Sequence, residues 1–219
     1  MKILITGGGT TERVDAVRYV GNISTGRTAS RIADWLSEKG HEIIYLRGQN
    51  SEIPRGRKIK IINYNDFKNL WEKIKKILSS QDVDILVQAA AVADYSPSRI
   101  MAGNLKIKPS GKTKIPSSLN SLTVSFRKNF KILDRIKNIS KNKRIFVFGF
   151  KLTCNADRKE RRHAAFQVKA DAVALNDLSE IKKEHPFHIY MKKRKTTYVP
   201  NAEKLAERIE KIAKKATTR

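Results

Sequence analysis

Residues 2–9 of this chain read KILITGGG, a short apolar run that ends in three glycines. Such a run predicts a buried strand, and glycines directly after it let backbone N–H groups approach a phosphate closely. The loop lacks the Gly-Lys-Ser/Thr of a Walker loop and the third glycine of a dinucleotide fingerprint. A second predicted strand ends in Leu46-Arg47 rather than in the acidic residue that holds an NAD ribose. The segment therefore predicts a phosphate-binding strand tip and disfavours NAD, with a simple tight turn as the alternative.

Outward from this strand, the apolar residues alternate between helical and strand periods. Helical spacing covers about residues 25–39, 67–78, 130–139, 158–169 and 202–213. Strand-like runs cover residues 42–46, 58–62, 83–91, 145–150 and 172–175, and a late β-hairpin is predicted over 188–199. This alternation predicts an α/β fold, an open and mostly parallel Rossmann-like sheet with helices on both faces. Such sheets bind ligands beyond the carboxyl ends of their strands.

One stretch, about residues 95–127, breaks this rhythm. It contains Pro97, Gly103, Pro109, Gly111 and Pro116 and shows little helical period. We interpret it as a functional flap rather than a core element. With no internal repeat and no second domain evident, residues 1–219 are expected to form a single domain.

Composition restricts the function classes. The net charge is +25, with a surplus of 5 in residues 1–100 and 20 in residues 101–219. Such a field attracts nucleotides, phosphorylated metabolites or nucleic acid, although solvated lysines account for most of it equally well. Cys154 is the only cysteine, so no intramolecular disulfide can form. We expect a cytoplasmic protein with no signal peptide and with Cys154 packed as a small hydrophobe; the four histidines lack metal-ligand spacing.

Two further segments have the composition of anion sites. In RYVGNISTGR (18–27), Ser24 and Thr25 are predicted N-caps of the following helix, and Arg18 and Asn22 could grip a carboxylate or phosphate there. In AAAVADY (89–95), small residues at a strand end leave room for a ligand, and Asp94 can accept hydrogen bonds. The alternatives are an ordinary capped helix for the first segment and close helix packing for the second.

Six motifs in order then resemble the phosphopantothenoylcysteine synthetases: GGGTTE, DAVRYVGNISTGR, AAAVADYSP, GNLKIKPS, FGFKLT and ADAVALNDLSEI. The resemblance covers residues 2 to about 181 and looks like the stand-alone form of the family. It implies a ligase of coenzyme A biosynthesis that joins 4'-phosphopantothenate to L-cysteine. The intermediate would be an acyl-nucleotide made from CTP or ATP, with Mg²⁺ carried on the triphosphate. The resemblance also implies a homodimer in which a flap reaches toward the partner's site.

The same resemblance implies roles for individual residues. Catalytic roles fall on Asn22, Lys106 and Arg18, and substrate binding on Arg18, Asn22, Ser24 and Gly26. The nucleotide-binding positions are Gly8, Gly9, Thr10, Ala90, Ala91, Asp94, Lys108, Asn129, Gly149, Phe150 and Lys169. Asn176 and Asp177 match a family turn. The chain departs from the family at residues 128–132, where only Asn129 and Ile132 of an Asn-Pro-Asp-Ile pattern carry over.

Two other readings compete with a ligase. The first is an NAD(P)-dependent short-chain-type reductase, since Tyr64 and Lys68 have the Tyr-x-x-x-Lys spacing of such enzymes. This pair falls too early, before the strand that ends at Ala91, and the glycine fingerprint is incomplete. The second is a non-catalytic basic nucleic-acid-binding protein, which would need a recognised module or aromatic platforms among its lysines. Only 7% of the residues are aromatic, so this reading is also disfavoured.

Overall fold

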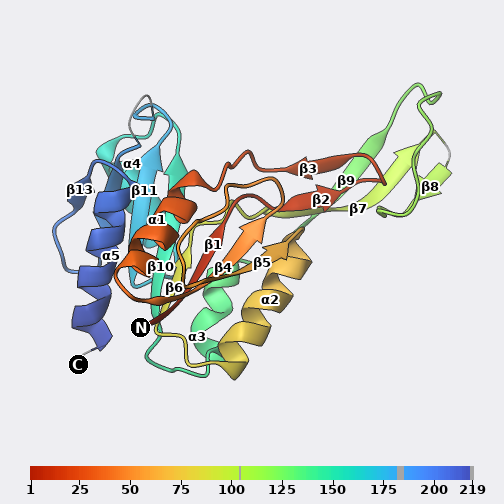
Figure 1. Ribbon diagram of the computed structural model, residues 1–219. Coiled ribbons are helices and arrows are strands. Elements are labelled where there is room, and N and C mark those ends of the chain that lie inside the picture. Colours follow the sequence, from red (N-terminus) through yellow and green to blue (C-terminus); the bar gives the residue numbers. More distant parts are fainter. Residues whose placement is uncertain (104, 182–184, 218–219) are drawn as a thin grey trace.

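The computed structural model describes residues 1–103, 105–181 and 185–217. An eight-stranded sheet in the order β13-β12-β11-β10-β6-β1-β4-β5 forms its centre (Figure 1). Six strands are parallel: β1 (Lys2–Gly7), β4 (Glu42–Gly48), β5 (Ile59–Tyr64), β6 (Ile85–Gln88), β10 (Phe146–Thr153) and β11 (Ala172–Asp177). The late hairpin, β12 (Phe187–Tyr190) and β13 (Thr197–Val199), adds two antiparallel strands at one edge. The predicted fold class is confirmed.

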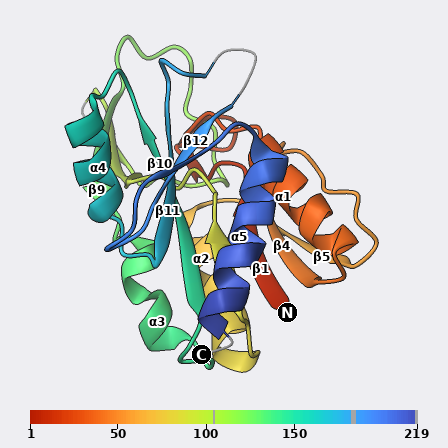
Figure 2. The same ribbon diagram turned by 90° about the vertical axis from the view of Figure 1, so that its left-hand side faces the viewer.

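Helices cover both faces of this sheet, as Figure 2 shows. Alternate residues of β1 separate the two layers, because successive strand side chains point to opposite faces. Ile3 and Ile5 pack toward α1 (Arg27–Glu38) and α5 (Ala202–Thr217). Leu4 packs toward α2 (Phe67–Ser80) and toward the 3₁₀ turn η1 (Ile132–Arg135) with α3 (Ile136–Ile139). The helix α4 (Arg158–Phe166) covers β11 and β12 on the face that α2 and α3 also cover.

A separate three-stranded antiparallel sheet projects from the body, and we call it the arm (Figure 1). It consists of β7 (Tyr95–Ala102), β8 (Leu105–Ile107) and β9 (Thr123–Lys128), in the order β8-β7-β9. A ribbon of β2 (Thr11–Arg13) and β3 (Tyr19–Gly21) lies along its base. Val14, Ile100 and Ile115 form a small apolar cluster there, apart from the main core. The predicted flap thus has regular strands that its sequence pattern did not indicate.

Several local predictions were wrong. Helix α1 begins at Arg27 with Gly26 as its N-cap, and no side chain caps it, so Ser24 and Thr25 are not caps. Gly26 adopts the left-handed conformation at φ +70°, and the N-cap therefore lies two residues past Ser24. The strand predicted over 83–91 is only Ile85–Gln88, because the chain beyond it bends to bond the β1 loop.

The cysteine prediction was also wrong. Cys154 is exposed rather than packed, because the chain leaves the sheet at Thr153 and Cys154 lies beyond the covered part of β10. Within the described residues, no helix combines the length and apolar character needed to cross a membrane.

The candidate active-site crevice

The tips of β1 and β6 are joined beyond the carboxyl edge of the sheet. Gly9 and Ala91 form a parallel bridge, the Ala91 N–H donates to the Gly8 carbonyl (2.9 Å), and the Thr10 N–H donates to the Ala91 carbonyl (3.2 Å). β4 lies on one side of β1 and β6 on the other, so the chain crosses to opposite sides of the sheet at this point. Doubly wound folds hold their ligands at such a switch point.

Side-chain hydroxyls fix the two loops further. The Ala90 N–H donates to Thr6 Oγ1 (3.1 Å), and the Ala93 N–H donates to the buried Thr10 Oγ1 (2.9 Å). From the other side, the Tyr64 hydroxyl donates to the carbonyls of Gly7 and Gly8, at 3.0 and 3.1 Å. Thr10, Ala90 and Ala91 are therefore brought together, as the resemblance implies.

Tyr64 is a structural residue in this arrangement. It is completely buried, and burial raises the pKa of its phenol far above its usual range. The phenol therefore stays protonated and its hydrogen is given to the glycine loop. A reductase tyrosine has to face its substrate, so this burial argues against the short-chain reductase reading.

The start of α1 lies against the glycine loop. A Cβ on Gly26 would be 3.1 Å from the Gly8 nitrogen, so the two backbones approach more closely than side chains allow. Gly8 itself has φ +86°, a conformation that glycine adopts without strain. The positive end of α1 is thereby aimed at the β1 tip, where an anion would be stabilised.

A cavity of about 420 Å³ opens beside these loops. Its lining residues come from β3, the β6 tip and the arm: Val20, Gly21, Asn22, Ala93, Asp94, Tyr95 and Phe126. The Asn22 amide donates to the Val92 carbonyl (3.2 Å), and a Cβ on Gly9 would lie 2.5 Å from the Asn22 carbonyl oxygen. Asn22 and Asp94 thus line one crevice, with two aromatic rings on its arm side, and Gly9 packs against the Asn22 backbone beside it.

Asp94 and Asn129 are connected at the floor of the crevice. The Asn129 N–H donates to the Asp94 carbonyl (2.8 Å), and its side-chain amide donates to the Ala93 carbonyl (3.0 Å). The Asp94 carboxylate pairs with Lys131, and both side chains are more than half exposed. Sequence reasoning did not identify Lys131, because it lies in the stretch that departs from the family pattern.

Arg18 lies at the base of the arm. It donates to the buried Asp15 carboxylate (2.5 Å) and to the Ile115 carbonyl (3.2 Å). Burial alone would raise the pKa of Asp15, but N–H groups of Ile115, Val17 and Arg18, with the Arg18 guanidinium, lower it to about 2. In this arrangement Arg18 ties β3 to the arm and does not line the cavity.

Several other predicted site residues lie away from the cavity. Lys106 on β8 and Lys108 just after it are exposed, at the far end of the arm (Figure 1). Gly149 is buried in β10, where a Cβ would meet Val168 at 3.0 Å. The Phe150 ring packs at a tilt against Phe148 and edge-to-face against Phe187. Lys169 is exposed and lies 3.8 Å from Asp134. Ser24 is half-buried between Asn22 and the helix start and does not line the cavity either.

Two buried polar residues near the crevice were missed. Glu12 accepts hydrogen bonds from the Phe67 N–H (2.8 Å) and the Ser96 hydroxyl (2.7 Å), which joins the start of α2 to the arm. It is part of GGGTTE, which was its sequence signal.

Gln88, at the β6 tip, is 6% exposed and finds no hydrogen-bond partner for either amide atom among the described residues. A polar residue that ends an apolar run was the signal for Gln88.

The Asn176-Asp177 turn has a structural explanation. Asp177 is fully buried and accepts hydrogen bonds from the Thr153 hydroxyl (2.6 Å) and the Asn155 N–H (2.9 Å). Hydrogen bonds from Ser179 and Thr153 hold its pKa well below the usual range. Asp177 therefore fixes the loops that follow β10 and β11. Across the described ranges, no three His, Cys, Asp or Glu side chains gather as a metal site would require.

Comparisons with known proteins give a consistent family. A protein-family model, that of the DNA/pantothenate metabolism flavoprotein C-terminal domain, matches residues 1–217. The "Coenzyme A biosynthesis bifunctional protein CoaBC" of Vibrio vulnificus is 29% identical over 177 residues, which are 81% of this chain and 41% of that protein. That of Methanocaldococcus jannaschii is 27% identical over 184 residues, 82% of this chain and 41% of that protein. The chain thus spans about two fifths of the length of these curated relatives.

Solved structures are similar over nearly the whole chain. The DNA/pantothenate metabolism flavoprotein from Streptococcus pneumoniae superimposes with a TM-score of 0.83 at 27% identity, covering 97% of this chain and 98% of that one. A mutant of Cab2 in complex with phosphopantothenate-cysteine gives a TM-score of 0.78 at 17% identity, covering 99% and 87%. The second likeness shows the fold alone.

Proposed function

Because the chain belongs to the family of the DNA/pantothenate metabolism flavoprotein C-terminal domain, we propose that it is a phosphopantothenate–cysteine ligase of coenzyme A biosynthesis. It joins 4'-phosphopantothenate to L-cysteine and consumes a nucleoside triphosphate. Its relatives named for coenzyme A biosynthesis support this pathway. The Cab2 mutant, whose structure is a complex with phosphopantothenate-cysteine, shares the fold. The proposal treats residues 1–219 as one ligase domain, with residues 95–127 as its flap and the cytoplasm as its location.

One observation carries the proposal: Asn22 and Asp94 line a single crevice at the switch point of the sheet, and the Asn22 backbone packs against Gly9 of the glycine loop. N–H groups of the glycine loop and the start of α1 favour a phosphate at the β1 tip. The Asn22 amide, with one N–H already given to Val92, retains a second N–H and its oxygen for the reacting acyl group. The crevice can therefore hold a phosphate and a carboxyl group side by side.

The proposed chemistry needs these groups because a carboxylate does not react with an amine at neutral pH. The carboxylate oxygen of phosphopantothenate attacks the α-phosphorus of the triphosphate, the bond to the β-phosphate oxygen breaks, and pyrophosphate leaves. The cysteine amine then attacks the acyl carbonyl, loses a proton, and displaces the nucleoside monophosphate. The protein contributes positioning and charge neutralisation to both steps. Mg²⁺ carried on the triphosphate would lower the charge of the attacked group.

Charge neutralisation by the protein falls to the arm. Lys106 and Lys108 are exposed at its far end and lie outside the cavity of their own chain. We therefore propose a homodimer in which the arm delivers these lysines to the crevice of the partner subunit. An arm that closes over bound substrates would also keep water from the anhydride.

The test is direct. Purified protein is incubated with 4'-phosphopantothenate, L-cysteine and Mg²⁺, with CTP and ATP in separate reactions, and pyrophosphate is assayed. We expect pyrophosphate release that depends on phosphopantothenate, and product formation that depends on cysteine. The two reactions also establish which nucleotide is used. If neither CTP nor ATP gives pyrophosphate, and circular dichroism shows that the protein is folded, the proposed function is rejected.

A further inference from the structure

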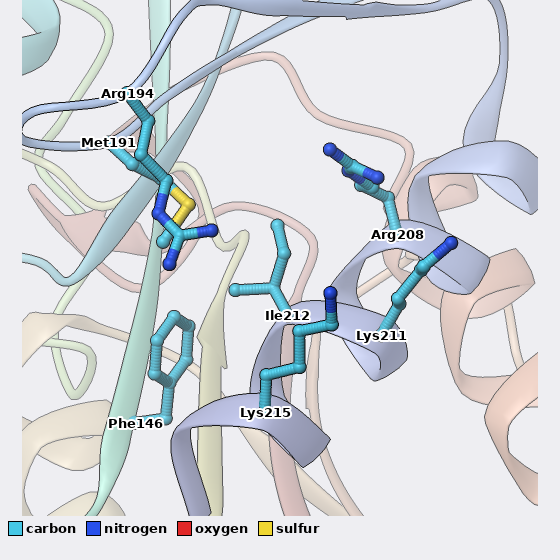
Figure 3. A pocket seen from close by; sticks show the side chains of 7 residues that line it. All are labelled: Phe146, Met191, Arg194, Arg208, Lys211, Ile212 and Lys215. Atoms are coloured by element: carbon cyan, nitrogen blue, oxygen red, sulfur yellow. The ribbon is translucent and has the colours of Figure 1, made fainter.

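A second cavity lies at the opposite edge of the sheet, far from the crevice. It measures about 470 Å³ and is bounded by the first residue of β10, the turn after β12 and the face of α5 (Figure 3). β10 begins at this edge, with Phe146, and ends on the crevice side of the sheet, at Thr153. The two cavities are therefore separated by the length of the parallel strands.

The lining of this cavity combines cations with an apolar floor. The cations are Arg194, Arg208, Lys211 and Lys215, and the apolar residues are Phe146, Met191 and Ile212. In Figure 3 the side chains of Arg194 and Met191 extend from the hairpin toward those of Ile212 and Lys215 on α5. Within the described part of the chain, no carboxylate lines the cavity.

The neighbouring glutamates of α5 are already engaged elsewhere. Glu207 pairs with Lys204 (3.0 Å), and Glu210 pairs with His41 (2.8 Å) and Lys214 (2.7 Å). Four cationic residues consequently line one concave surface without a carboxylate among its lining residues, and Figure 3 shows the Lys211 nitrogen turned away from Arg194 and Lys215. Such a surface raises the local concentration of anions. The apolar residues lower the local dielectric constant, which strengthens the attraction between the cations and a bound anion.

Helix stability alone does not explain this arrangement. Arg208, Lys211 and Lys215 are spaced i, i+3 and i+7 and form one stripe of α5, where neighbouring like charges repel. The dipole of α5 favours a cation in its last turn, which accounts for Lys215. It does not account for Arg208, a turn or more earlier, or for Arg194, which comes from another element.

Arg208 supplies a second, independent observation. Its Nε atom is buried and has no hydrogen-bond partner among the described residues. Buried donors are nearly always satisfied in folded proteins, and a guanidinium prefers a charged oxygen. Arg208 therefore carries a donor that no described residue satisfies, and a phosphate is a fitting partner for its guanidinium group.

We propose that this cavity binds an organic phosphate, with the phosphoryl group held by Arg194, Arg208 and Lys215. Guanidinium groups match phosphate oxygens in bidentate geometry. The apolar portion of the ligand lies against Phe146, Met191 and Ile212, and the volume falls in the usual range for small-molecule sites. The site is separate from the crevice and does not depend on the proposed ligase activity.

The test uses the full chain and a defined probe, 1-naphthyl phosphate, which carries a dianionic phosphate and a flat apolar group. Its fluorescence is followed during titration with wild-type protein. The double variant R194E/K215E is compared with K192E/K195E, which makes the same charge change on exposed lysines outside the lining. We expect R194E/K215E to weaken binding by about tenfold or more and K192E/K195E to leave it within about twofold. Inorganic phosphate, which lacks the apolar group, should bind at least about tenfold more weakly.

Location is read from amide NMR shifts on the same titration. Shifts at residues 191–194 and 208–215 support the site, whereas shifts confined to Gly8, Gly9 and Thr10 would put the probe in the crevice and overturn the proposal. If both double variants weaken the binding of 1-naphthyl phosphate equally, the probe is held by the overall positive charge and not by this cavity, and the proposal is rejected. Binding of a single-stranded RNA that R194E/K215E abolishes, without binding of 1-naphthyl phosphate, would replace the assignment with nucleic acid.

Discussion

The crevice at the strand tips and the arm differ in the interactions that form them and in the side chains that they present. Backbone hydrogen bonds, two threonine hydroxyls and the Tyr64 hydroxyl fix the crevice. The arm is a small antiparallel sheet whose lysines are exposed. Among the described residues that line the crevice cavity there is no cation, although the proposed reaction brings two anions together there. The comparison indicates a division of labour: the crevice supplies shape and hydrogen bonds, and the arm supplies positive charge.

The largest effect is expected when either contribution is removed. Asn22→Ala takes an amide from the crevice, and Lys106→Ala takes a charge from the arm. Each should lower kcat by roughly 10²-fold or more, as the loss of one preorganised donor at a reacting group does. Both side chains are exposed in the free protein, so the unfolding midpoint should hardly move. Steady-state pyrophosphate release and urea unfolding measure the two quantities.

Matched controls are Asn138→Ala on α3 and Lys112→Ala in the arm, both exposed and outside the crevice lining. Mixing the two inactive variants then tests where Lys106 acts. If the arm serves its partner, random dimers contain one intact site in half of the molecules, which restores about a quarter of the activity. No recovery after subunit exchange would mean that Lys106 acts within its own chain.

A second comparison concerns glycines, and here the expected effect is on stability. In Gly9→Ala the new Cβ would lie 2.5 Å from the Asn22 carbonyl oxygen, so the crevice loops must separate. We expect a loss of about 2–3 kcal/mol in the free energy of unfolding, typical of overpacking a close contact. In Gly103→Ala, in the arm, φ is +58° but no atom of the described residues lies within 4 Å of the new Cβ. The cost should therefore be about 1 kcal/mol, from backbone conformation alone. Urea unfolding of both variants decides, and equal losses would show that the crevice loops are not closely packed.

The same contrast explains what the sequence could predict. β1, β4, β10 and β11 are nearly continuous apolar runs buried on both faces, and their patterns located them well. The arm strands were missed because β9 is almost wholly exposed and β7 contains Pro97, so neither shows a regular alternation. A strand without a buried face leaves little trace in its own sequence.

The crevice was predictable only in part. The glycine loop, Asn22 and Asp94 were found because their motifs follow predicted strands or precede a predicted helix. Lys131, Glu12 and Gln88 were not, because their roles depend on tertiary neighbours: Asp94 for Lys131, Phe67 and Ser96 for Glu12, and the absence of a described partner for Gln88. The N-cap of α1 was mispredicted for the same reason, since the contact between Gly26 and Gly8 is not local in the sequence.

The third prediction concerns the contact of Asp15 with Arg18 and Ile115 at the base of the arm, and it is tested by the pH dependence of stability. The folded-state pKa of Asp15 is about 2, below its ordinary value of 3.8, because N–H donors and Arg18 outweigh the effect of burial. A depressed carboxyl pKa contributes stability above pH 4, and this contribution is lost as the pH falls from about 4 to 2. In Asp15→Asn that part of the pH dependence should disappear, which urea unfolding between pH 2 and 6 measures. If the free energy of unfolding of Asp15→Asn falls with acid as steeply as that of the wild type, Asp15 is not the group whose protonation destabilises the protein.

The smallest effect is expected at Lys131, and it is the sharpest test of the division of labour. Lys131 is a cation bound directly to a crevice residue, through its ion pair with Asp94. Both partners are more than half exposed, so Lys131→Ala should change the free energy of unfolding by no more than about 0.5 kcal/mol. Because Asp94 already neutralises this charge, kcat should also change by only about twofold to threefold, the equivalent of a similar free energy. A loss of turnover as large as that of Lys106→Ala would mean that the crevice carries its own catalytic cation, and the arm would then no longer be needed to supply one.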